Sequence, residues 1–409
     1  MRNWFASYKN IDRSVFLLII AECCLQLINA AFMLILLIYM QKSGYPDYKG
    51  ADFIKYRFLS VLLFSVPVGL YIRNRPIRPL FYFASLVVPI SSLVILYAVE
   101  HHYDYLIYGA QFIWGIGFSC IQIAALPYIL RNSSPGTITE GISLSHATWS
   151  IAGLFSGILI YALHGYDPVS FHERNLLFLF AIAGFAAALF VAMMDKNEKL
   201  NDPEAVDSEK NKNYDWNLII EASIPIVIIA VGAGLTIPFI SLFFFNIHGI
   251  DSDRFSLIAA LALGLVVTGT MLVPQIKNRL GYRLAVPLTQ SLAVLSLIAL
   301  AFTELWKGNS WALYLAIFFY AIRQPLMNMA GPMTSEVTMN YVGKRNQEMM
   351  SALSASIWSG SWFISAYMFE LLRKNDISYM SIFLITSGLY AVGIIAYVLL
   401  FRKHEQKNA

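Results

Sequence analysis

Two charged residues lie deep within long apolar runs of this chain, where charge is costly. Glu22 stands about eight residues into the first run and Arg323 about thirteen residues into a later one, near the middle of a membrane-length helix. On insertion scales, an Arg or Asp at the centre of a membrane helix costs roughly 2.5–3.5 kcal/mol. Both residues are therefore predicted to face a protein interior or a wet cavity, where they could bind a proton or a solute.

Glu22 suits the binding of a proton or of a cationic group on a substrate. Two other interpretations stay open: a fixed counter-charge for Arg323, or a hydrogen-bonded packing residue. Gln26 and Asn29 follow Glu22 at i+4 and i+7, so the three side chains share one helical face. They predict a polar stripe that lines a cavity.

Arg323 could clamp an anion or act as a coupling partner that alternates between Glu22 and the solute. The structural alternatives are a permanent ion pair and a contact with free carbonyl groups near Pro325. Asn328 shares a face with Gln324, whereas Arg323 lies about 100° around the helix from Gln324. A kink at the proline could relax that limit. We include Asn328 with Arg323 among the predicted binding residues.

Two further residues are candidates for the wall of the same cavity. Gln111 lies eleven positions, or about three turns, before Gln122 on one helical face. It could bind the solute or make an interhelical hydrogen bond, which is worth about 1 kcal/mol or less. Trp358 could supply an aromatic wall or simply pack against other helices.

A basic loop and one acidic residue are predicted to form a latch at the inner membrane surface. Arg279 and Arg283 stand in this loop, and Glu336 lies near the inner end of a later span. Opposite charges at this boundary can pair in one conformation and separate in another. We expect Glu336 to pair with Arg279 or Arg283.

Twelve apolar runs position these residues. A bilayer core of roughly 30 Å needs about 20 apolar residues per helix. A chain of 409 residues that is 58% hydrophobic and 13% charged has too little polar surface for a water-soluble body. The predicted spans are about 14–40, 52–72, 77–99, 104–130, 142–164, 174–194, 217–247, 252–276, 283–303, 310–340, 347–372 and 378–401.

The expected fold is an all-α membrane protein with twelve transmembrane helices in two pseudo-symmetric six-helix bundles. The first bundle is predicted over residues 1–194 and the second over 217–409. Between them, the segment 195–216 carries seven acidic residues and four Lys, so we interpret it as a cytoplasmic tether.

The placement of charge predicts the orientation of the chain. Most of the 29 Lys and Arg residues lie on the side of the membrane that holds the amino terminus. By the positive-inside rule, both termini are predicted to be cytoplasmic. Arg57 is placed among the few outer cations, at the beginning of the second span.

Two motifs are typical of one transporter family. Residues 278–283 read N-R-L-G-Y-R, and residues 111–117 read Q-F-I-W-G-I-G. In these stretches the chain resembles the major facilitator superfamily, whose members carry G-x-x-x-D-R-x-G-x-R after spans 2 and 8 and R-x-x-x-G-x-G in span 4. Asn278 replaces the usual Asp, and Gln111 replaces the usual Arg. The resemblance covers nearly the whole chain and implies two six-helix bundles that rock about a central cavity.

The sequence contains no motif of an enzyme or of a metal site. It has no His-x-x-x-His or Cys-x-x-Cys pattern, no Gly-x-Ser-x-Gly and no phosphate-binding glycine-rich loop. We therefore expect no cofactor, no bound metal and no direct use of ATP. Nucleic-acid binding is not expected either, because no basic run is interleaved with aromatic residues.

The leading hypothesis is a secondary active transporter for a small anionic or polar solute, coupled to protons through Glu22. Uniport and exchange also suit one acidic and one basic residue. The main alternative is a broad-specificity exporter of amphipathic compounds; a non-transporting receptor or an intramembrane enzyme is a more distant one. The expected partners are the solute, protons and the bilayer. The compact outer loops, which lack a glycosylation sequon, suit a bacterial inner membrane. We also expect the protein to be a monomer.

Overall fold

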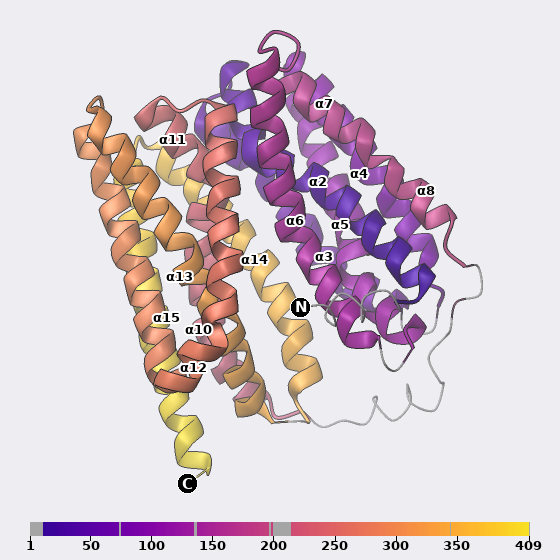
Figure 1. Cartoon of the computed structure of the whole chain (residues 1–409), viewed down its shortest axis with the longest axis vertical. Helices are drawn as coiled ribbons and strands as arrows, with labels where there is room; N and C mark the ends of the chain where they lie inside the picture. Colours follow the sequence, from indigo (N-terminus) through magenta and orange to yellow (C-terminus); the bar gives the residue numbers. More distant parts are fainter. Residues whose placement is uncertain are drawn as a thin grey trace, which may run out of the picture. The chain divides into compact units, whose positions relative to one another are not determined.

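The computed structural model describes residues 11–72, 75–134, 137–195, 198, 214–343 and 345–408, and these residues form helices and short connections without a β-strand (Figure 1). The contacts divide the chain into two compact units. The first unit contains Met1–Tyr45 and Tyr56–Asn211, and the second contains Pro46–Lys55 and Lys212–Ala409. Most of the predicted tether, residues 196–197 and 199–213, lies outside the described residues.

The first unit is built around its amino-terminal helix. This helix, α2, packs against α4, α5, α6, α7 and α8. It is apolar on almost every side, which suits a helix enclosed by others. The bounds are α2 Arg13–Lys42, α3 Asp47–Ile72, α4 Arg78–Glu100, α5 Asp104–Asn132, α6 Ile138–Tyr166, α7 Glu173–Gly184 and α8 Ala186–Ala192. Of α3, the part from Tyr56 onward belongs to this unit and the beginning belongs to the second.

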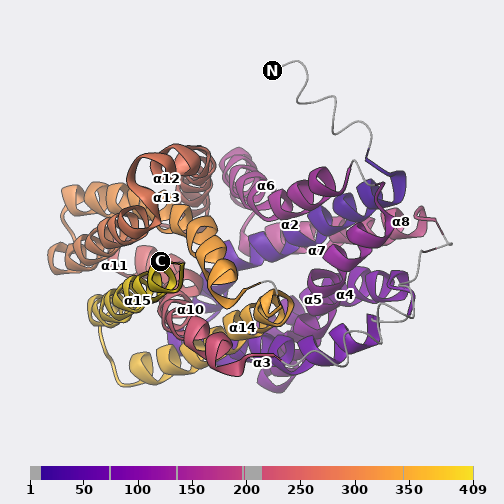
Figure 2. The same cartoon turned by 90° about the horizontal axis from the view of Figure 1, so that it is seen from below.

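The second unit contains the remaining six crossings. A 3-10 turn, η1, interrupts its first crossing at Pro238, which cannot donate a backbone hydrogen bond. In the views of Figures 1 and 2, α12 and α13 run side by side. The bounds are α10 Trp216–Thr236, η1 Ile237–Phe239, α11 Ile240–His248, α12 Ser252–Phe302, η2 Thr303–Trp306, α13 Ser310–Val342, α14 Gln347–Lys374 and α15 Tyr379–Asn408.

Helix α12 supplies two crossings because it reverses at a glycine. Its 51 residues would span about 77 Å if straight, more than twice the thickness of a bilayer core of about 30 Å. Gly281 has φ 65° and ψ 167°, a backbone conformation that favours glycine, and this residue separates the two arms.

The prediction of twelve membrane helices is confirmed. Among the described residues, ten helical segments are long and apolar enough to cross a membrane. The two other long helices are α13, with 33 residues, and α14, with 28. Both exceed the length that a crossing needs, but their sequences are more polar. Helix α13 carries the predicted site residues Arg323 and Asn328.

Candidate functional site

Glu22 is buried in the first unit beside a hydroxyl group. Only 7% of Glu22 is exposed, and its Oε2 accepts a hydrogen bond of 2.6 Å from Ser145 Oγ on α6. Among the described residues, Glu22 takes part in no ion pair. A hydroxyl can donate to an ionised carboxylate or accept from a protonated one. The environment therefore suits a carboxyl that gains and loses a proton.

Gln26 and Asn29 continue the buried polar face of α2. Asn29 Nδ2 donates to Gln26 Oε1 at 3.4 Å, and both side chains are buried. The two amides and Glu22 thus occupy one side of α2, as their spacing predicts. Their role as a cavity lining stays a prediction.

Arg323 is buried in the second unit beside a tyrosine. Its Nη2 donates to Tyr390 Oη on α15 at 3.3 Å, and its guanidinium lies 5.9 Å from the centre of the same ring. The ion pairs of the described residues do not include Arg323. A neutral phenol satisfies a donor but does not balance the charge. The anion clamp and the pairing with Glu22, which belongs to the other unit, both stay predictions.

The other two predicted binding residues of this unit are exposed. Asn328 Nδ2 donates to the carbonyl of Gln324 at 2.8 Å, one turn earlier in α13. Trp358 on α14 is 41% exposed. Both could face either lipid or an aqueous cavity, so their contact with a solute stays a prediction.

Arg57 lies within a span, whereas the sequence predicted it at an outer end. Helix α3 begins at Asp47, which places Arg57 about 15 Å from the start of the helix. Arg57 is 5% exposed, and its Nε donates to Gln111 Oε1 on α5 at 2.8 Å. Its guanidinium lies 3.9 Å from the centre of the Trp114 ring. Like Glu22, Arg57 is thus a buried charge of the first unit that has no ion-pair partner among the described residues.

The contacts of Arg57 leave its charge without a counter-ion. The hydrogen bond to Gln111 and the Trp114 ring offset part of the cost of burial, but both groups are neutral. No described carboxylate pairs with Arg57. The buried atoms Arg57 Nη2, Gln111 Nε2 and Trp114 Nε1 also have no hydrogen-bond partner among the described residues.

The predicted inner latch has a different cation. Lys277 Nζ lies 2.9 Å from both carboxylate oxygens of Glu336, in the place expected for Arg279 or Arg283. The same Nζ lies 4.7 Å from the centre of the Tyr282 ring. Lys277 lies about one turn before the reversal at Gly281, on the arm that packs against α13. In this structure the partner of Glu336 is therefore Lys277, and a pairing of Glu336 with Arg279 or Arg283 stays a prediction.

A residue of the predicted tether contacts the inner end of the first unit, which the sequence did not indicate. Glu198 accepts hydrogen bonds from the backbone amides of Ile77 at 2.7 Å and Arg78 at 3.2 Å, at the start of α4. Arg131 Nη1, at the end of α5, lies 3.8 Å from Glu198 Oε1. A carboxylate is stabilised at this position because the amino end of a helix carries partial positive charge.

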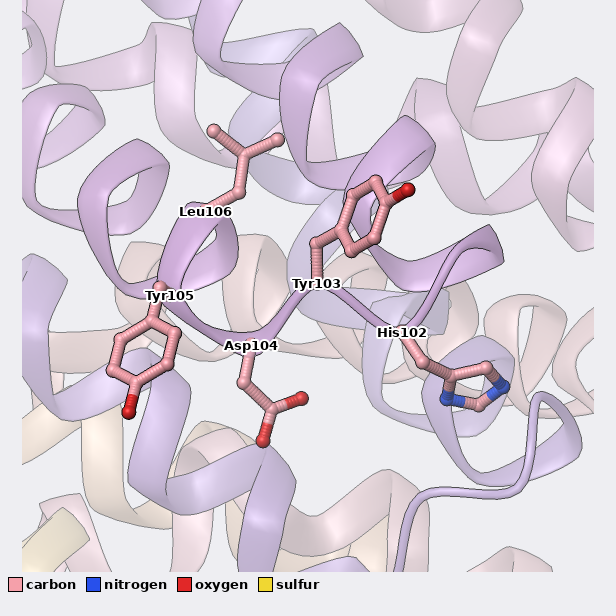
Figure 3. Close-up of a pocket in the computed structure, with 5 residues that line it drawn as sticks. All are labelled: His102, Tyr103, Asp104, Tyr105 and Leu106. Carbon is pink, nitrogen blue, oxygen red and sulfur yellow. The ribbon is translucent and has the colours of Figure 1, made fainter.

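One pocket lies at the start of α5, a few residues before Gln111 in the chain. It is lined by His102, Tyr103, Asp104, Tyr105 and Leu106 at the turn between α4 and α5. Figure 3 shows their side chains pointing in different directions from the turn. None of these five residues is a predicted site residue.

Comparisons with known proteins agree with this architecture. A search of curated proteins finds no match. The POT family transporter PepTSo has a TM-score of 0.74 at 12% identity, over 96% of this chain and 98% of that one. The D-xylose-proton symporter also has a TM-score of 0.74 at 12% identity, over 95% and 96% of the two chains.

A bacterial homologue of the human lysosomal transporter Spinster has a TM-score of 0.69 at 14% identity, over 95% of this chain and 96% of that one. At these identities, the likeness shows a shared fold. The sequence itself matches the model of the Major Facilitator Superfamily over residues 18–366. This match covers most of the chain, including Glu22, Arg57 and Arg323. The chain therefore belongs to the Major Facilitator Superfamily and is a membrane transporter.

Proposed function

We propose that this transporter moves a small anionic or polar solute by alternating access, coupled to protons. The observation that carries the proposal is the pair of buried charges, Glu22 and Arg323. Each contacts a neutral hydroxyl group and has no counter-ion among the described residues. In a transporter, charges that are costly to bury and lack a permanent partner suit the binding of transported charges.

Glu22 is the proposed proton site. Its hydrogen bond with the Ser145 hydroxyl can form with either protonation state of the carboxyl. A permanent ion pair would instead hold the carboxylate ionised throughout the cycle. Gln26 and Asn29, on the same face of α2, would bind neutral polar groups of the solute.

Arg323 is the proposed anion clamp, with Asn328 and Trp358 on neighbouring parts of the second unit. A guanidinium presents five donors in a planar fork that matches a carboxylate. The similar structures include a POT family transporter in complex with 5-aminolevulinic acid, which has a carboxylate, and the D-xylose-proton symporter. These relatives support a small polar solute and a proton drive for this chain.

The proposed setting is a bacterial inner membrane, with a monomer whose two termini are cytoplasmic. The excess of Lys and Arg on one side supports this orientation. The Lys277–Glu336 pair then lies at the inner surface, where a latch between conformations would act. Arg279 and Arg283 would take part in that latch in another conformation, because α12 reverses between them.

A ligand screen followed by transport tests this proposal. Purified protein is screened by thermal shift against anionic metabolites and their neutral amide or ester analogues, since a bound solute stabilises the folded protein by mass action. We expect an anionic solute to raise the melting temperature and to enter proteoliposomes saturably. Arg323→Met should lose most of the preference for the anion over its neutral analogue. An equal preference in this variant would contradict the anion clamp.

A further inference from the structure

We infer that Arg57, Gln111 and Trp114 form a binding site for an anion that carries only hydrogen-bond acceptors, such as a carboxylate group or a halide. The site lies within the first unit, between α3 and α5. It adds a cationic centre to the proposed Glu22 and Arg323. The inference rests on the proposed function only in one respect, namely that a bound carboxylate would belong to the solute.

The hydrogen bond between Arg57 and Gln111 determines which way the amide faces. Arg57 Nε can only donate, so it must meet the amide oxygen of Gln111, which lies 2.8 Å away. The amide nitrogen of Gln111 therefore points elsewhere as a donor. It has no partner in the described structure, although the residue is fully buried.

All the unsatisfied atoms of this cluster are donors. They are Arg57 Nη2, Gln111 Nε2 and Trp114 Nε1, and each is buried. A guanidinium, an amide nitrogen and an indole nitrogen cannot accept a hydrogen bond here. Buried polar groups in native proteins nearly always have partners, so the missing partner must be an acceptor.

The net charge of the cluster favours an anion over a water molecule. Arg57 carries a full positive charge, and neither Gln111 nor Trp114 is ionisable at neutral pH. No described acidic residue forms an ion pair with Arg57. Water could satisfy one donor but would leave the charge unbalanced in a dry interior.

Close helix packing holds these side chains in place. A Cβ atom added to Gly115 would lie 2.3 Å from the Arg57 carbonyl oxygen, so α3 and α5 can approach this closely only with glycine there. On the other side, the Phe32 ring of α2 packs edge-on against the Trp114 ring at 4.7 Å. The donors are thus preorganised, which lowers the entropic cost of binding.

The test measures anion-dependent stability of the full chain, purified in detergent micelles at low ionic strength. Sodium chloride and sodium acetate are titrated separately while thermal unfolding is followed. We expect at least one of them to raise the melting temperature saturably. A response to chloride alone indicates a halide site, and a response to acetate indicates a carboxylate site; either result supports the inference.

Variants separate this site from general salt effects. Arg57→Met should require at least tenfold more anion for half of the shift. Trp114→Phe keeps an aromatic ring, although a smaller one, removes the indole donor and should weaken binding about three- to tenfold. Arg174→Met is the matched control, because Arg174 lies in an exposed pair with Glu100 and should leave the wild-type response unchanged.

Gln111→Glu provides the sharpest comparison. It places a carboxylate beside the Arg57 guanidinium, so the protein then carries its own anion. We expect this variant to melt at the same temperature with and without added anion, at least as high as the anion-saturated wild type. If Arg57→Met does not fold, this variant and Trp114→Phe still decide the question.

Two results would overturn the inference. One is that neither anion stabilises the wild type more than it stabilises Trp114→Phe or Arg57→Met. The other is a Gln111→Glu variant that keeps the full wild-type dependence on anion. The melting temperature is measured without a gradient and without transport. A failure of the proposed proton coupling would therefore not change the result of this anion-binding test.

Discussion

At the scale of single residues, the informative feature is which partner each buried charge has. Glu22 contacts Ser145, Arg323 contacts Tyr390, and Arg57 contacts Gln111. All three partners are neutral. None of the three charges has an ion-pair partner among the described residues, which supports the proposal that they bind a proton or a solute.

The partner of Arg323 gives a prediction. Tyr390→Phe removes the hydroxyl that accepts from Arg323 Nη2 and keeps the ring. The loss of a hydrogen bond to a charged group costs about 1.5–3 kcal/mol, which corresponds to a factor of about 10–150 because each 1.4 kcal/mol is about tenfold. We therefore expect KM for the solute to rise within about that range. The measurement is initial uptake into proteoliposomes over a series of solute concentrations.

The control for this variant is Tyr397→Phe, a buried tyrosine two turns later in α15 that has no described contact with Arg323. It should leave KM near the wild-type value. An unchanged KM in Tyr390→Phe would show that Tyr390 does not orient Arg323 for the solute.

The sequence indicated Glu22 and Arg323 because each interrupts a long apolar run. It placed Arg57 wrongly for the opposite reason. Charged residues at the beginning of α3, including Asp47, Asp52 and Lys55, lower the hydropathy of that segment, so the span was predicted to begin later than it does. Asp47 accepts hydrogen bonds from Arg373 and Tyr379, which explains how a charged first turn is accommodated.

At the scale of helices and connections, the reversal of α12 places the strictest demand on residue type. Gly281 has a φ of 65° with an extended ψ, where a Cβ is disfavoured. Gly281→Ala should therefore cost about 1–3 kcal/mol and lower the melting temperature. The measurement is thermal unfolding in detergent.

Gly264→Ala is the matched control in the same element. Gly264 lies within the helical part of α12, and nothing lies within 4 Å of an added Cβ. Alanine in a helix interior is about 1 kcal/mol more favourable than glycine, so this variant should be as stable as the wild type or more so. Equal effects of the two substitutions would show that the backbone at Gly281 does not require glycine.

The connection between α5 and α6 gives a prediction about pH. Asp12, directly before α2, accepts hydrogen bonds from the backbone amide of Ser134 at 2.6 Å and from Thr137 Oγ1 at 3.2 Å. Burial raises the pKa of Asp12, but the hydrogen bonds from Ser134 and Thr137 outweigh this effect and lower the pKa below its ordinary value. The carboxyl therefore contributes stability above its unfolded pKa and loses it as the pH falls through the folded pKa.

We expect Asp12→Asn to melt below the wild type at pH 7. This difference should shrink as the pH is lowered below about 4, where the wild-type carboxyl also becomes neutral. Melting curves of both proteins across this range test the prediction. A difference that stays constant with pH would rule out ionisation of Asp12 as its cause.

Connections were less predictable from the sequence than spans. Lys277 pairs with Glu336 because a reversal in α12 decides which basic side chain meets α13, and the sequence pattern shows only that several basic residues are near. Glu198 similarly reaches the start of α4 from the predicted tether. Contacts between segments distant along the chain depend on helix orientation, which hydropathy does not specify.

At the scale of the whole molecule, hydropathy and two short motifs predicted the helix number and the superfamily. Each crossing must satisfy its own backbone hydrogen bonds and must be long enough for the bilayer, so each span can be predicted from its own stretch of sequence. The identity of the solute cannot be predicted from one stretch of sequence in this way. The proposed recognition depends on neutral partners such as Ser145 and Tyr390, whose residue types are common in any helix.

The orientation of the molecule is also testable. Both termini are predicted to be cytoplasmic because most Lys and Arg residues lie on that side. A reporter fused after the carboxyl terminus should be active only if that terminus is cytoplasmic, and a periplasmic reporter there should be silent. A fusion after Asp167, in the connection between α6, which ends at Tyr166, and α7, should give the reverse pattern.

The most direct test of the central claim is transport by Glu22→Gln in proteoliposomes, with a solute identified by thermal shift. We expect this variant to lose uptake or efflux driven by a pH gradient but to retain solute exchange. Exchange requires the conformational change of the transporter but no net proton release. Glu100→Gln, in an exposed pair with Arg174, should behave like the wild type in both assays. Full gradient-driven transport by Glu22→Gln would contradict the account.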